Sequence, residues 1–424
     1  MVNYSKYMFK AVTICFSLNI GGAGIAANRF KNLLENNATN IEVDSITQDA
    51  GGKFQLLKRL ISFFLSKFQF DGNPIKHSLN LFSFNPVLNS FKKTKDIVYH
   101  LHWLNNDTLS ILDFDKIPPG SVITLHDEWL YCGSEHVYKI HDNSNDFIHG
   151  YHYFKKGVFG INWNFLIWKI KHKKLQHRND LIYTVPSNWM LERAKSSSML
   201  KKSDIRLLPN PIDCEVFKPS SKNLVNSFKS NLNIDNDSFI IVFASTNQKN
   251  KLKGINLLNK ALQLLHSRSK HTPVPKIVLV NFGERKDEKM LCGFRNISIG
   301  YVKDPSYLAE LYSLADCVVI PSMVESFGQV AAEALACCTP VVSFDTSGLR
   351  DIVHHRSNGL VANAFSPISL YEQLLEMINI SQKSRLIMGE NGRKHILENF
   401  SCPILANQYF NILKDAAALQ NSLD

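Results

Sequence analysis

Short apolar runs, each about the length of a strand, alternate with longer segments of helix length along the first half of the chain. Most of these runs end in polar loops, which is the pattern of strands that are buried on both faces and joined by helices. The alternation predicts strand–helix–strand units, and therefore a largely parallel sheet with helices on both faces. The expected strands are residues 8–18, 97–102, 121–126, 181–185 and 205–208.

A second alternating series follows a segment that lacks regular patterning. Residues 208–213 contain two prolines, and the stretch up to about residue 236 is polar, so we place the linker between two domains there. The second series again predicts an α/β domain with a doubly wound sheet. Its expected strands lie near residues 239–245, 276–282, 297–301, 316–320 and 340–343, and its expected helices near residues 253–268, 304–314 and 328–338.

The limits of the domains follow from these two series. Residues 1–213 are expected to form an N-terminal Rossmann-like domain, and residues 214–395 a C-terminal one. The tail from about residue 381 has helical spacing and no accompanying strand. We therefore expect residues 396–424 to form a C-terminal helix that packs across the domain junction.

The composition agrees with a folded chain that has sizeable cores. Of the 424 residues, 45% are apolar and 20% are charged, which excludes a disordered chain. Polar residues interrupt every hydrophobic run before the roughly 18 residues that a membrane-spanning helix needs. Eight cysteines are scattered without a C-x-x-C pair, which favours a reducing cytoplasm and supports neither a metal site nor a nucleophilic thiol.

The N-terminus allows two interpretations. Lys6 and Lys10 precede the apolar residues 11–18, an order that resembles a secretory signal. The apolar run is short and rich in strand-forming residues, and it leads through glycines into a helical pattern. We therefore favour a buried first strand.

Positive charge is concentrated in the first half of the chain. Lys and Arg outnumber Asp and Glu by 26 to 17 over residues 1–210 and by 22 to 20 over the remainder, which gives a net charge of +11. In the basic half, residues 54–70 and 163–174 combine apolar bulk with basic side chains. Such helices either cover a sheet or lie on an anionic membrane surface, and both alternatives stay open. Nucleic acid is not an expected partner, because no binding motif accompanies the charge.

A glycine-rich turn follows the first expected strand. Gly22, Gly24 and Ala27 fit the pattern G-x-G-x-x-G/A, in which backbone N–H groups at the start of a helix attract phosphate. A nicotinamide dinucleotide would use Asp44 to hold its ribose, if a second strand follows the glycine-rich helix and ends just before this residue. Glycines that are needed only for a tight turn would give the same pattern, so the motif alone does not identify a ligand.

Two acids lie around a strand–loop–helix transition in the second domain. Glu325 is in the loop after a buried strand, and Glu333 lies eight residues later, inside a helix that begins near Gly328. This spacing lets both carboxylates face one cleft, where Glu325 suits a hexose hydroxyl and Glu333 suits the vicinal hydroxyls of a ribose. The free N–H groups at the start of the helix suit an anion or a hydroxyl.

The segment from Glu325 to Glu333 resembles the E-x7-E motif of the retaining glycosyltransferases of family 4. That family has the GT-B fold, with two Rossmann-like domains and a cleft between them. Similar residues recur at 207–213, 340–343, 347–348 and 358–359, so the resemblance covers essentially the whole second domain. The resemblance implies that the donor is bound by Ser326, Phe327, Gly328 and Glu333.

The resemblance extends to the first domain. Gly21 and Gly22 lie where the family's first glycine loop meets the donor diphosphate, and residues 124–129 look like its histidine-bearing loop. This implies that His126 contacts the donor sugar near the reacting carbon, with a packed or surface histidine as the alternative. The two acids that follow His126 receive no catalytic role.

Lys253, at the start of an expected helix, matches the family lysine that neutralises the leaving diphosphate. A cation there lowers the barrier as charge builds on the β-phosphate, and no metal is then required. A solvated surface lysine is the alternative. The family usually has an arginine about five residues earlier, where this sequence has Gln248; Lys249 and Lys251 are alternative replacements, and the second cation stays unassigned.

Two further patterns are interpreted as structural. D-x-D, the metal-binding signature of a different glycosyltransferase fold, occurs at residues 113–115 and 235–237, but both copies lie in polar connections where turn acids are common. His100 and His102 share one face of a strand, and no third ligand accompanies them. Neither pattern predicts a metal site.

The expected function is the transfer of a hexosyl group from a UDP-, GDP- or dTDP-sugar to a hydroxyl of a glycan or lipid-linked acceptor. The resemblance implies retention of the anomeric configuration, with His126, Glu325 and Lys253 as catalytic residues and without a cofactor or metal. Bacterial lipopolysaccharide or exopolysaccharide biosynthesis is the expected setting, in the cytoplasm or at the inner face of the cytoplasmic membrane. An NAD(P)-dependent oxidoreductase and a non-catalytic sugar-nucleotide-binding protein are the alternatives.

Overall fold

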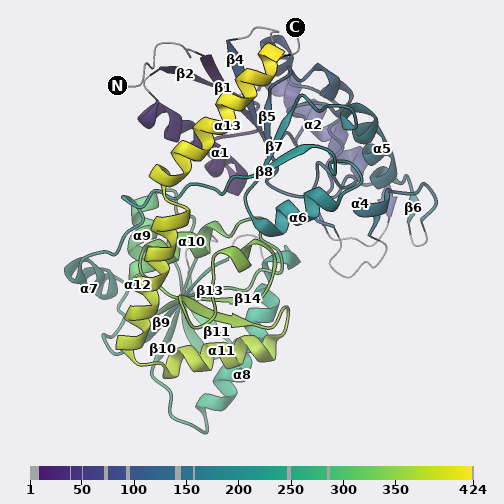
Figure 1. Cartoon of the computed structure of the whole chain (residues 1–424). Coiled ribbons are helices and arrows are strands. Elements are labelled where there is room, and N and C mark those ends of the chain that lie inside the picture. Colours follow the sequence, from purple (N-terminus) through teal and green to yellow (C-terminus); the bar gives the residue numbers. More distant parts are fainter. Residues whose placement is uncertain are drawn as a thin grey trace. The chain divides into compact units, whose positions relative to one another are not determined.

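The computed structural model describes residues 9–38, 40–49, 51–70, 75–91, 96–138, 145–155, 158–245, 250–283 and 287–422. The chain divides into two compact units (Figure 1). The N-terminal unit contains Met1–Asn210 and Leu405–Asp424, and the C-terminal unit contains Pro211–Ile404.

The N-terminal unit is built on a six-stranded sheet in which every neighbouring pair is parallel. The strand order is β2-β1-β4-β5-β7-β8, so the chain moves outward from β1 in both directions. Its strands are β1 (Phe9–Cys15), β2 (Ile41–Thr47), β4 (Ile97–His102), β5 (Val122–Thr124), β7 (Ile182–Val185) and β8 (Asp204–Leu207). A separate antiparallel pair joins β3 (Gln69–Phe70) to β6 (Phe159–Gly160).

The C-terminal unit contains a seven-stranded sheet in the order β11-β12-β10-β9-β13-β14-β15. All neighbours are parallel except β11, which pairs antiparallel with β12 at one edge. The strands are β9 (Phe239–Ala244), β10 (Ile277–Phe282), β11 (Asp287–Leu291), β12 (Phe294–Ser298), β13 (Cys317–Ile320), β14 (Val341–Phe344) and β15 (Gly359–Ala362).

Helices connect the strands of both sheets. Those of the N-terminal unit are α1 (Gly21–Asn37), α2 (Lys53–Ser66), α3 (Asn85–Ser90), η1 (Ile111–Lys116), α4 (Asp146–His149), α5 (Trp163–Leu175) and α6 (Asn188–Ser196). Those of the C-terminal unit are α7 (Lys222–Asn231), η2 (Lys251–Lys253), α8 (Ile255–Ser269), α9 (Pro305–Leu314), α10 (Gln329–Ala336), η3 (Ser347–Asp351), α11 (Pro367–Asn379) and α12 (Gln382–Asn399). The last helix is α13 (Cys402–Ser422).

Side chains of the C-terminal sheet are buried on both of its faces. Ile240 and Val242 of β9 belong to one hydrophobic cluster, whereas Ile241 and Phe243 belong to another. Successive residues of a strand point to opposite faces, so this alternation places one cluster under each layer of helices. A continuous apolar run is what such a doubly covered strand requires, as the sequence pattern indicated.

The fold class expected from the sequence is confirmed, since each unit has a parallel, doubly wound α/β sheet. The strand expected at residues 8–18 is the shorter β1, which lies inside the sheet between β2 and β4. Besides the short pair β3 and β6, the strands β11 and β15 were not expected from the pattern. β11 is an edge strand with four exposed residues, and it therefore lacks the apolar run that identifies a buried strand.

The region assigned to a polar linker contains a helix, α7, which corrects that expectation. Ser221 caps the helix by accepting a hydrogen bond from the Leu224 N–H. Phe228 is buried, and its ring lies 5.1 Å from the ring of Tyr307 on α9. Val225 and Leu232, three residues before and four residues after Phe228, pack against the same cluster, so α7 has the spacing of a short amphipathic helix inside a largely polar segment.

The end of the chain also differs from the expected arrangement. Residues 396–399 are the last turn of α12, so the expected helix 396–424 is two helices, and Leu405–Asp424 group with the N-terminal unit. Within that unit the Tyr409 hydroxyl lies 2.6 Å from His100 Nδ1, and the Gln408 amide donates to the Leu207 carbonyl. No helix of the described residues is long and apolar enough to cross a membrane.

Candidate active site

The polar loops of the C-terminal unit gather where its strand order reverses. From β9 the chain proceeds to β10 and β12 on one side, and it then returns to β13 on the other side of β9. In doubly wound folds this switch point, at the carboxyl ends of the strands, is where ligands bind. Lys253 lies in η2 after β9, and Glu325 lies in the loop after β13, so both candidate catalytic residues of this unit stand at that point.

Lys253 and Glu325 form an ion pair, with 2.7 Å between Lys253 Nζ and Glu325 Oε1. Their side chains are 37% and 21% exposed, so the pair lies at the surface rather than in the core. The Met323 N–H donates to the Leu252 carbonyl, which ties the two loops together. An ion pair this accessible contributes about 1 kcal/mol or less, so an anionic ligand can displace it at little cost.

A third loop, after β14, holds the backbone of Glu325. The Glu325 N–H donates to Ser347 Oγ over 2.9 Å, and the Gly348 N–H donates to the Glu325 carbonyl over 2.9 Å. The Thr346 hydroxyl donates to the Met323 carbonyl. Because the backbone groups are satisfied by this loop, the carboxylate of Glu325 is held in place while it stays accessible.

Two glycines in these loops are required by their surroundings. Gly254 has φ +65°, and a Cβ there would lie 1.8 Å from the Pro321 carbonyl oxygen. Gly328 has φ +110°, and a Cβ there would lie 2.8 Å from Leu349 Cδ2. Glycine thus allows the η2 turn to approach the loop after β13 and allows the sharp entry into α10.

The remaining predicted donor-binding residues of this unit lie at or within α10. Ser326 is half-buried, whereas Phe327 is buried, with its ring 5.5 Å from the ring of Phe400, so only the backbone of Phe327 is placed to meet a ligand. No side chain caps the first turn of α10. Glu333 is 6% exposed, and its Oε2 accepts a hydrogen bond of 3.1 Å from the Tyr312 hydroxyl.

In the N-terminal unit, the predicted glycines open helix α1, which follows strand β1. Gly21 and Gly22 are exposed, and no atom of the described residues lies within 4 Å of a Cβ added at Gly21. No side chain caps this helix, and its first turn contains no acid. The N–H groups there are therefore accessible to an anion. Gly24 is required for close packing, since a Cβ there would lie 2.4 Å from the Ser17 carbonyl oxygen.

His126 follows β5, and its Nε2 lies 2.9 Å from Nδ1 of His102, the last residue of β4. The two rings are stacked, with 5.1 Å between their centroids. His126 is half-buried. Desolvation of its ring by the surrounding protein lowers the pKa of His126 to about 4, so the imidazole is neutral at pH 7. One of the two facing nitrogens must carry the proton that joins the rings, so His102 influences the tautomer of His126.

His100 and His102 are packed in the core, as the sequence indicated. His100 bonds Tyr409 through Nδ1 and Thr124 through Nε2. Burial lowers the pKa of His100 to about 3 and that of His102 well below its ordinary value. Across the part of the chain that the structure describes, no group of three His, Cys, Asp or Glu side chains is placed to hold a metal ion.

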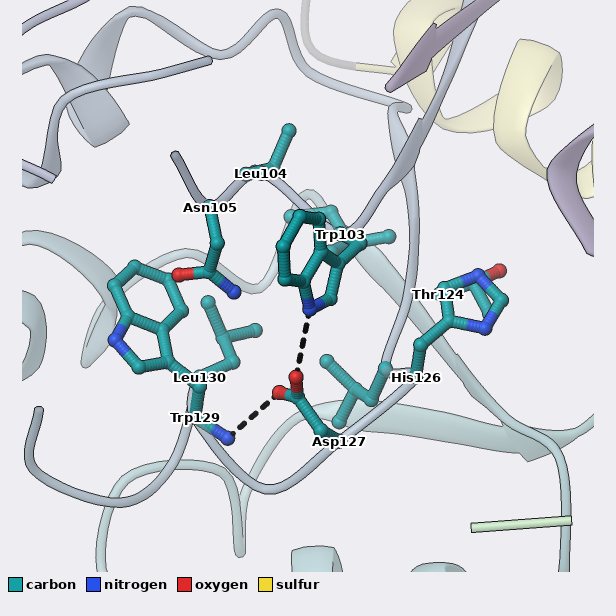
Figure 2. A pocket seen from close by; sticks show the side chains of 10 residues that line it. Trp103, Leu104, Asn105, Thr124, His126, Asp127, Trp129 and Leu130 are labelled. Atoms are coloured by element: carbon teal, nitrogen blue, oxygen red, sulfur yellow. Dashed lines mark hydrogen bonds between the residues drawn. The ribbon is translucent and has the colours of Figure 1, made fainter. Parts of the chain in front are cut away.

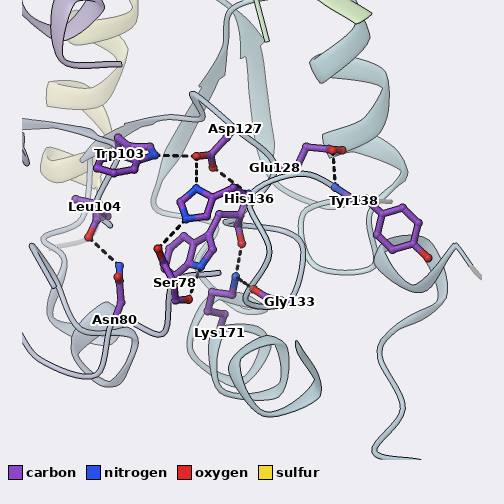
Figure 3. Close-up of polar contacts among 11 residues, drawn as sticks. Ser78, Asn80, Trp103, Leu104, Asp127, Glu128, Gly133, His136, Tyr138 and Lys171 are labelled. Atoms are coloured by element: carbon purple, nitrogen blue, oxygen red, sulfur yellow. Dashed lines mark hydrogen bonds and ion pairs between the residues drawn. The ribbon is translucent and has the colours of Figure 1, made fainter. Parts of the chain in front are cut away.

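Asp127 belongs to a buried hydrogen-bond network that the sequence did not reveal. Its Oδ2 accepts from Trp103 Nε1 over 2.7 Å and contacts His136 Nδ1 at 2.6 Å, while its Oδ1 accepts from the Trp129 N–H (Figures 2 and 3). These partners hold the pKa of Asp127 below its ordinary value despite its burial. The adjacent cavity has a volume of about 20 Å³, enough for about one water molecule and too small for a sugar.

The carboxylate oxygens of Glu128 likewise bond to other groups of the protein. It forms an ion pair with Arg193 and accepts hydrogen bonds from the Tyr131 hydroxyl and the Tyr138 N–H. Burial raises its pKa above the ordinary value. With their oxygens used in this way, neither Glu128 nor Asp127 is presented as a general base. Arg193 lies 65 residues along the chain from Glu128, so no local sequence pattern identifies this ion pair.

Acids of the two D-x-D segments, which the sequence indicated to be structural, form ion pairs. Asp113 pairs with Lys116, Asp115 with Lys174 and Asp235 with Lys276. Gln248 and Lys249 lie outside the described residues, and Lys251 is exposed in η2.

Asp44 does not lie after a strand, as the nicotinamide interpretation required. It lies in the middle of β2 and contacts Lys10 at 3.1 Å. The carboxylate that such a cofactor needs at the strand end is therefore not supplied by this residue.

Solved structures with the GT-B fold match both units. Sucrose-phosphate synthase from Thermosynechococcus elongatus is 17% identical and matches with a TM-score of 0.65, covering 97% of this chain and 99% of its own. HepE from Anabaena, solved in complex with UDP-glucose, is 15% identical and matches with a TM-score of 0.61, covering 96% of this chain and 99% of its own. The chain therefore has the GT-B fold.

Residues 225–395 match the family model of Glycosyl transferases group 1, so the C-terminal unit contains a domain of this kind. A D-inositol 3-phosphate glycosyltransferase of Paenarthrobacter aurescens is 31% identical over 197 residues, which are 45% of this chain and 47% of the relative. The chain thus matches about half the length of this curated relative.

Proposed function

We propose that the protein transfers a hexosyl group from a nucleoside diphosphate sugar to an acceptor hydroxyl with retention of the anomeric configuration. The observation that carries this proposal is the accessible Lys253–Glu325 pair at the switch point of a glycosyl transferases group 1 domain. A paired ammonium and carboxylate, both held by loops, suit a donor that offers phosphate oxygens and sugar hydroxyls next to each other. The UDP-glucose bound to HepE, a protein of the same fold, supports this class of donor.

Lys253 is proposed to bind the diphosphate. When the bond between the anomeric carbon and the β-phosphate oxygen breaks, its electron pair stays on the phosphate. An ammonium group and the uncapped N–H groups of α10 stabilise this developing charge. Glu325, released from Lys253, is proposed to accept hydrogen bonds from the sugar hydroxyls, and Ser326, Phe327 and Gly328 to offer backbone N–H groups.

Glu333 is proposed to bind the ribose. One of its carboxylate oxygens accepts from Tyr312, and this contact fixes the side chain within α10. A fixed carboxylate can bind two vicinal hydroxyls with less loss of side-chain freedom than a mobile one. This role is independent of the base, so UDP, GDP and dTDP remain alternative nucleotides for this site.

In the N-terminal unit, Gly21, Gly22 and His126 are proposed to contact the donor. The accessible N–H groups at α1 suit the diphosphate, and the neutral imidazole of His126 suits a sugar hydroxyl near the reacting carbon. The departing phosphate is proposed to take the proton of the acceptor hydroxyl, because Asp127 and Glu128 are both engaged elsewhere. No step requires a metal ion.

The acceptor is proposed to be a glycan or lipid-linked oligosaccharide of a bacterial lipopolysaccharide or exopolysaccharide pathway, with the reaction taking place in the cytoplasm. The D-inositol 3-phosphate glycosyltransferase relative supports an acceptor hydroxyl on a polar, cyclic polyol.

The proposal is tested by incubating the protein with UDP-, GDP- and dTDP-hexoses and measuring the release of nucleoside diphosphate. We expect release from donors with one of these bases, without added metal and in the presence of EDTA. The Glu325→Gln variant should release product at least about a hundredfold more slowly. Binding of a nucleotide sugar without any release, in the presence of a range of glycan and lipid acceptors, would indicate a binding protein and contradict the proposal.

A further inference from the structure

Helix α2 presents its polar residues to the protein and its apolar residues to the solvent. Gln55 and Ser62 are its buried residues. The Gln55 amide donates to the Asp107 carbonyl over 2.9 Å, and the Ser62 hydroxyl donates to Asp107 Oδ1 over 2.9 Å. Lys58 reaches the Ser83 carbonyl. The contact between α2 and the rest of the unit is therefore largely polar, which is the reverse of an ordinary surface helix.

The outward residues of α2 and β3 are large and apolar. Phe54 is 70% exposed and Phe64 is 69% exposed, so most of each aromatic side chain lies in solvent. Single exposed apolar residues need no explanation, but a contiguous group of this size marks an interaction surface. The exposed apolar residues of this segment are Phe54, Leu56, Leu57, Leu60, Ile61, Phe63, Phe64, Phe68 and Phe70.

A second segment extends the same surface. β6 pairs with β3, so Phe159 lies opposite Phe70. The Ile161 N–H donates to the Phe68 carbonyl over 2.9 Å, and Trp163 Nε1 donates to the Leu65 carbonyl over 2.7 Å. These bonds hold the end of α2 against β6 and the start of α5 (Figure 1). The exposed apolar residues added here are Tyr153, Phe154, Phe159 and Ile161.

All the charged side chains of this surface helix are basic. Residues 51–70 contain Lys53, Lys58, Arg59 and Lys67 and no Asp or Glu, and residues 147–179 contain no acid either. Lys53 and Lys67 are exposed, and Lys67 Nζ lies 4.7 Å from the centre of the Phe63 ring. Asp107, the acid beneath the helix, is buried. The charged side chains of α2 that accompany these apolar residues are therefore all positive.

We propose that α2, β3 and β6, together with Tyr153 and Phe154, form a surface that docks on an anionic lipid bilayer. Aromatic and aliphatic side chains would enter the interface between headgroups and acyl chains, and Lys53 and Lys67 would contact the anionic headgroups. Docking does not depend on the proposed function, because lipid binding requires neither donor nor turnover.

The charge pattern favours lipid over a second copy of the chain. In a twofold dimer the same patch meets itself, so the lysines of one patch would face those of the other without an acid to pair with. An anionic bilayer supplies negative charge at the edge of the apolar layer, where the exposed lysines lie. The patch is therefore complementary to such a membrane in both polarity and charge.

The test is co-sedimentation of the full chain with vesicles of phosphatidylcholine alone and of phosphatidylcholine mixed with phosphatidylglycerol. We expect binding to the mixed vesicles at low ionic strength, weaker binding at 0.5 M salt, and much weaker binding to phosphatidylcholine alone. Circular dichroism of each variant checks that it is folded.

Two double variants separate the apolar and the charged contributions. Phe54→Ser with Phe64→Ser should lower vesicle affinity about a hundredfold, roughly tenfold for each side chain withdrawn from the lipid. Lys53→Gln with Lys67→Gln should lower affinity for the mixed vesicles about twenty-five-fold, roughly fivefold for each charge. Vesicle binding is expected to fall in both.

Matched controls change the same residue types on the C-terminal unit. Ile368→Ser with Leu386→Ser removes two similarly exposed apolar side chains, and Lys260→Gln with Lys270→Gln removes two exposed lysines. Both controls should bind vesicles as the unchanged chain does. The proposal is overturned by absence of binding to the mixed vesicles at low salt, or by equal losses in the patch and control variants. Sedimentation velocity that shows a dimer abolished by the phenylalanine variants would assign the patch to a second copy and also overturn it.

Discussion

The two units have the same architecture, yet their candidate residues stand in opposite environments. In the C-terminal unit, Lys253 and Glu325 meet at the surface, and their loops are held by backbone hydrogen bonds. In the N-terminal unit, His126 and Asp127 belong to networks in which most polar atoms already have partners within the protein. The contrast shows that the Lys253–Glu325 pair is accessible to solvent, whereas most polar atoms around His126 and Asp127 already bond within the protein.

The largest effect is expected from the surface ion pair. Lys253→Met and Glu325→Gln should each lower the rate of nucleoside diphosphate release by about 10² to 10³, because Lys253 is proposed to stabilise the charge on the departing phosphate and Glu325 to hold the sugar hydroxyls in the reactive position. The free energy of unfolding should change by about 1 kcal/mol or less, since the pair is accessible to solvent. Donor turnover and urea unfolding measure the two quantities.

Lys260→Met, which changes an exposed lysine on α8, is the matched control and should retain the full rate. A Lys253→Met variant that keeps more than half of the activity would show that the pair has no part in catalysis.

The next effect concerns the glycines of the two units. Gly254→Ala should lower the free energy of unfolding of the C-terminal unit by roughly 3 kcal/mol, because a positive φ and a clash with the Pro321 carbonyl act together. Gly21→Ala also has a positive φ but meets open space, so about 1 kcal/mol is expected. Hydrogen exchange of peptides from each unit measures the two changes separately. Equal losses at the two glycines would refute the close approach at Gly254.

A smaller effect is expected from His100, a buried histidine of the N-terminal unit, on the pH dependence of the free energy of unfolding. The pKa of His100 is about 3 in the folded chain, below its ordinary value of about 6.5. As pH falls below 6.5, the unfolded chain binds a proton that the folded chain excludes, so stability is lost. His100→Gln removes this contribution, and the variant should lose about 2 kcal/mol less than the unchanged chain between pH 7 and pH 5.

Urea unfolding at the two pH values measures this difference, and His271→Gln, at an exposed histidine of the C-terminal unit, should leave the pH dependence unchanged. If His100→Gln has the same pH dependence as the unchanged chain, the folded form of His100 already binds the proton.

The smallest effect is expected at the D-x-D segments. Asp235→Asn breaks an exposed pair with Lys276 and should change stability by about 0.5 kcal/mol or less and leave the rate of donor turnover within twofold. The same rate should be measured with EDTA present. A large loss of metal-dependent activity in this variant would instead place a cation at residue 235.

Much of the fold could be predicted from sequence, because strands buried on both faces give continuous apolar runs. β9, β10 and β13 are such strands, and each was expected within one or two residues of its bounds. The loop that contains Glu325 was also recognisable, since its acids flank a strand–loop–helix transition. Helix α7 was missed although Val225, Phe228 and Leu232 have helical spacing, because these few apolar residues stand in a segment whose polar composition resembles a linker.

Other features could not be predicted because they depend on partners from distant parts of the chain. The support of Glu325 by Ser347 and the bond between His126 and His102 join loops that follow different strands. The orientation of α2 is a further case. Its amphipathic pattern gives the same period whether the apolar side faces inward or outward, and only the buried contacts of Gln55 and Ser62 decide between them.

The most direct test of the central claim is the hydrogen-exchange footprint of a bound nucleoside diphosphate. UDP, GDP and dTDP are each added to the full chain, and exchange is followed by mass spectrometry. The account predicts that at least one of them slows exchange in peptides covering residues 250–256 and 321–333, and that Lys253→Met weakens this protection. Binding of a nucleotide that leaves both segments unprotected would contradict the assignment of the donor site.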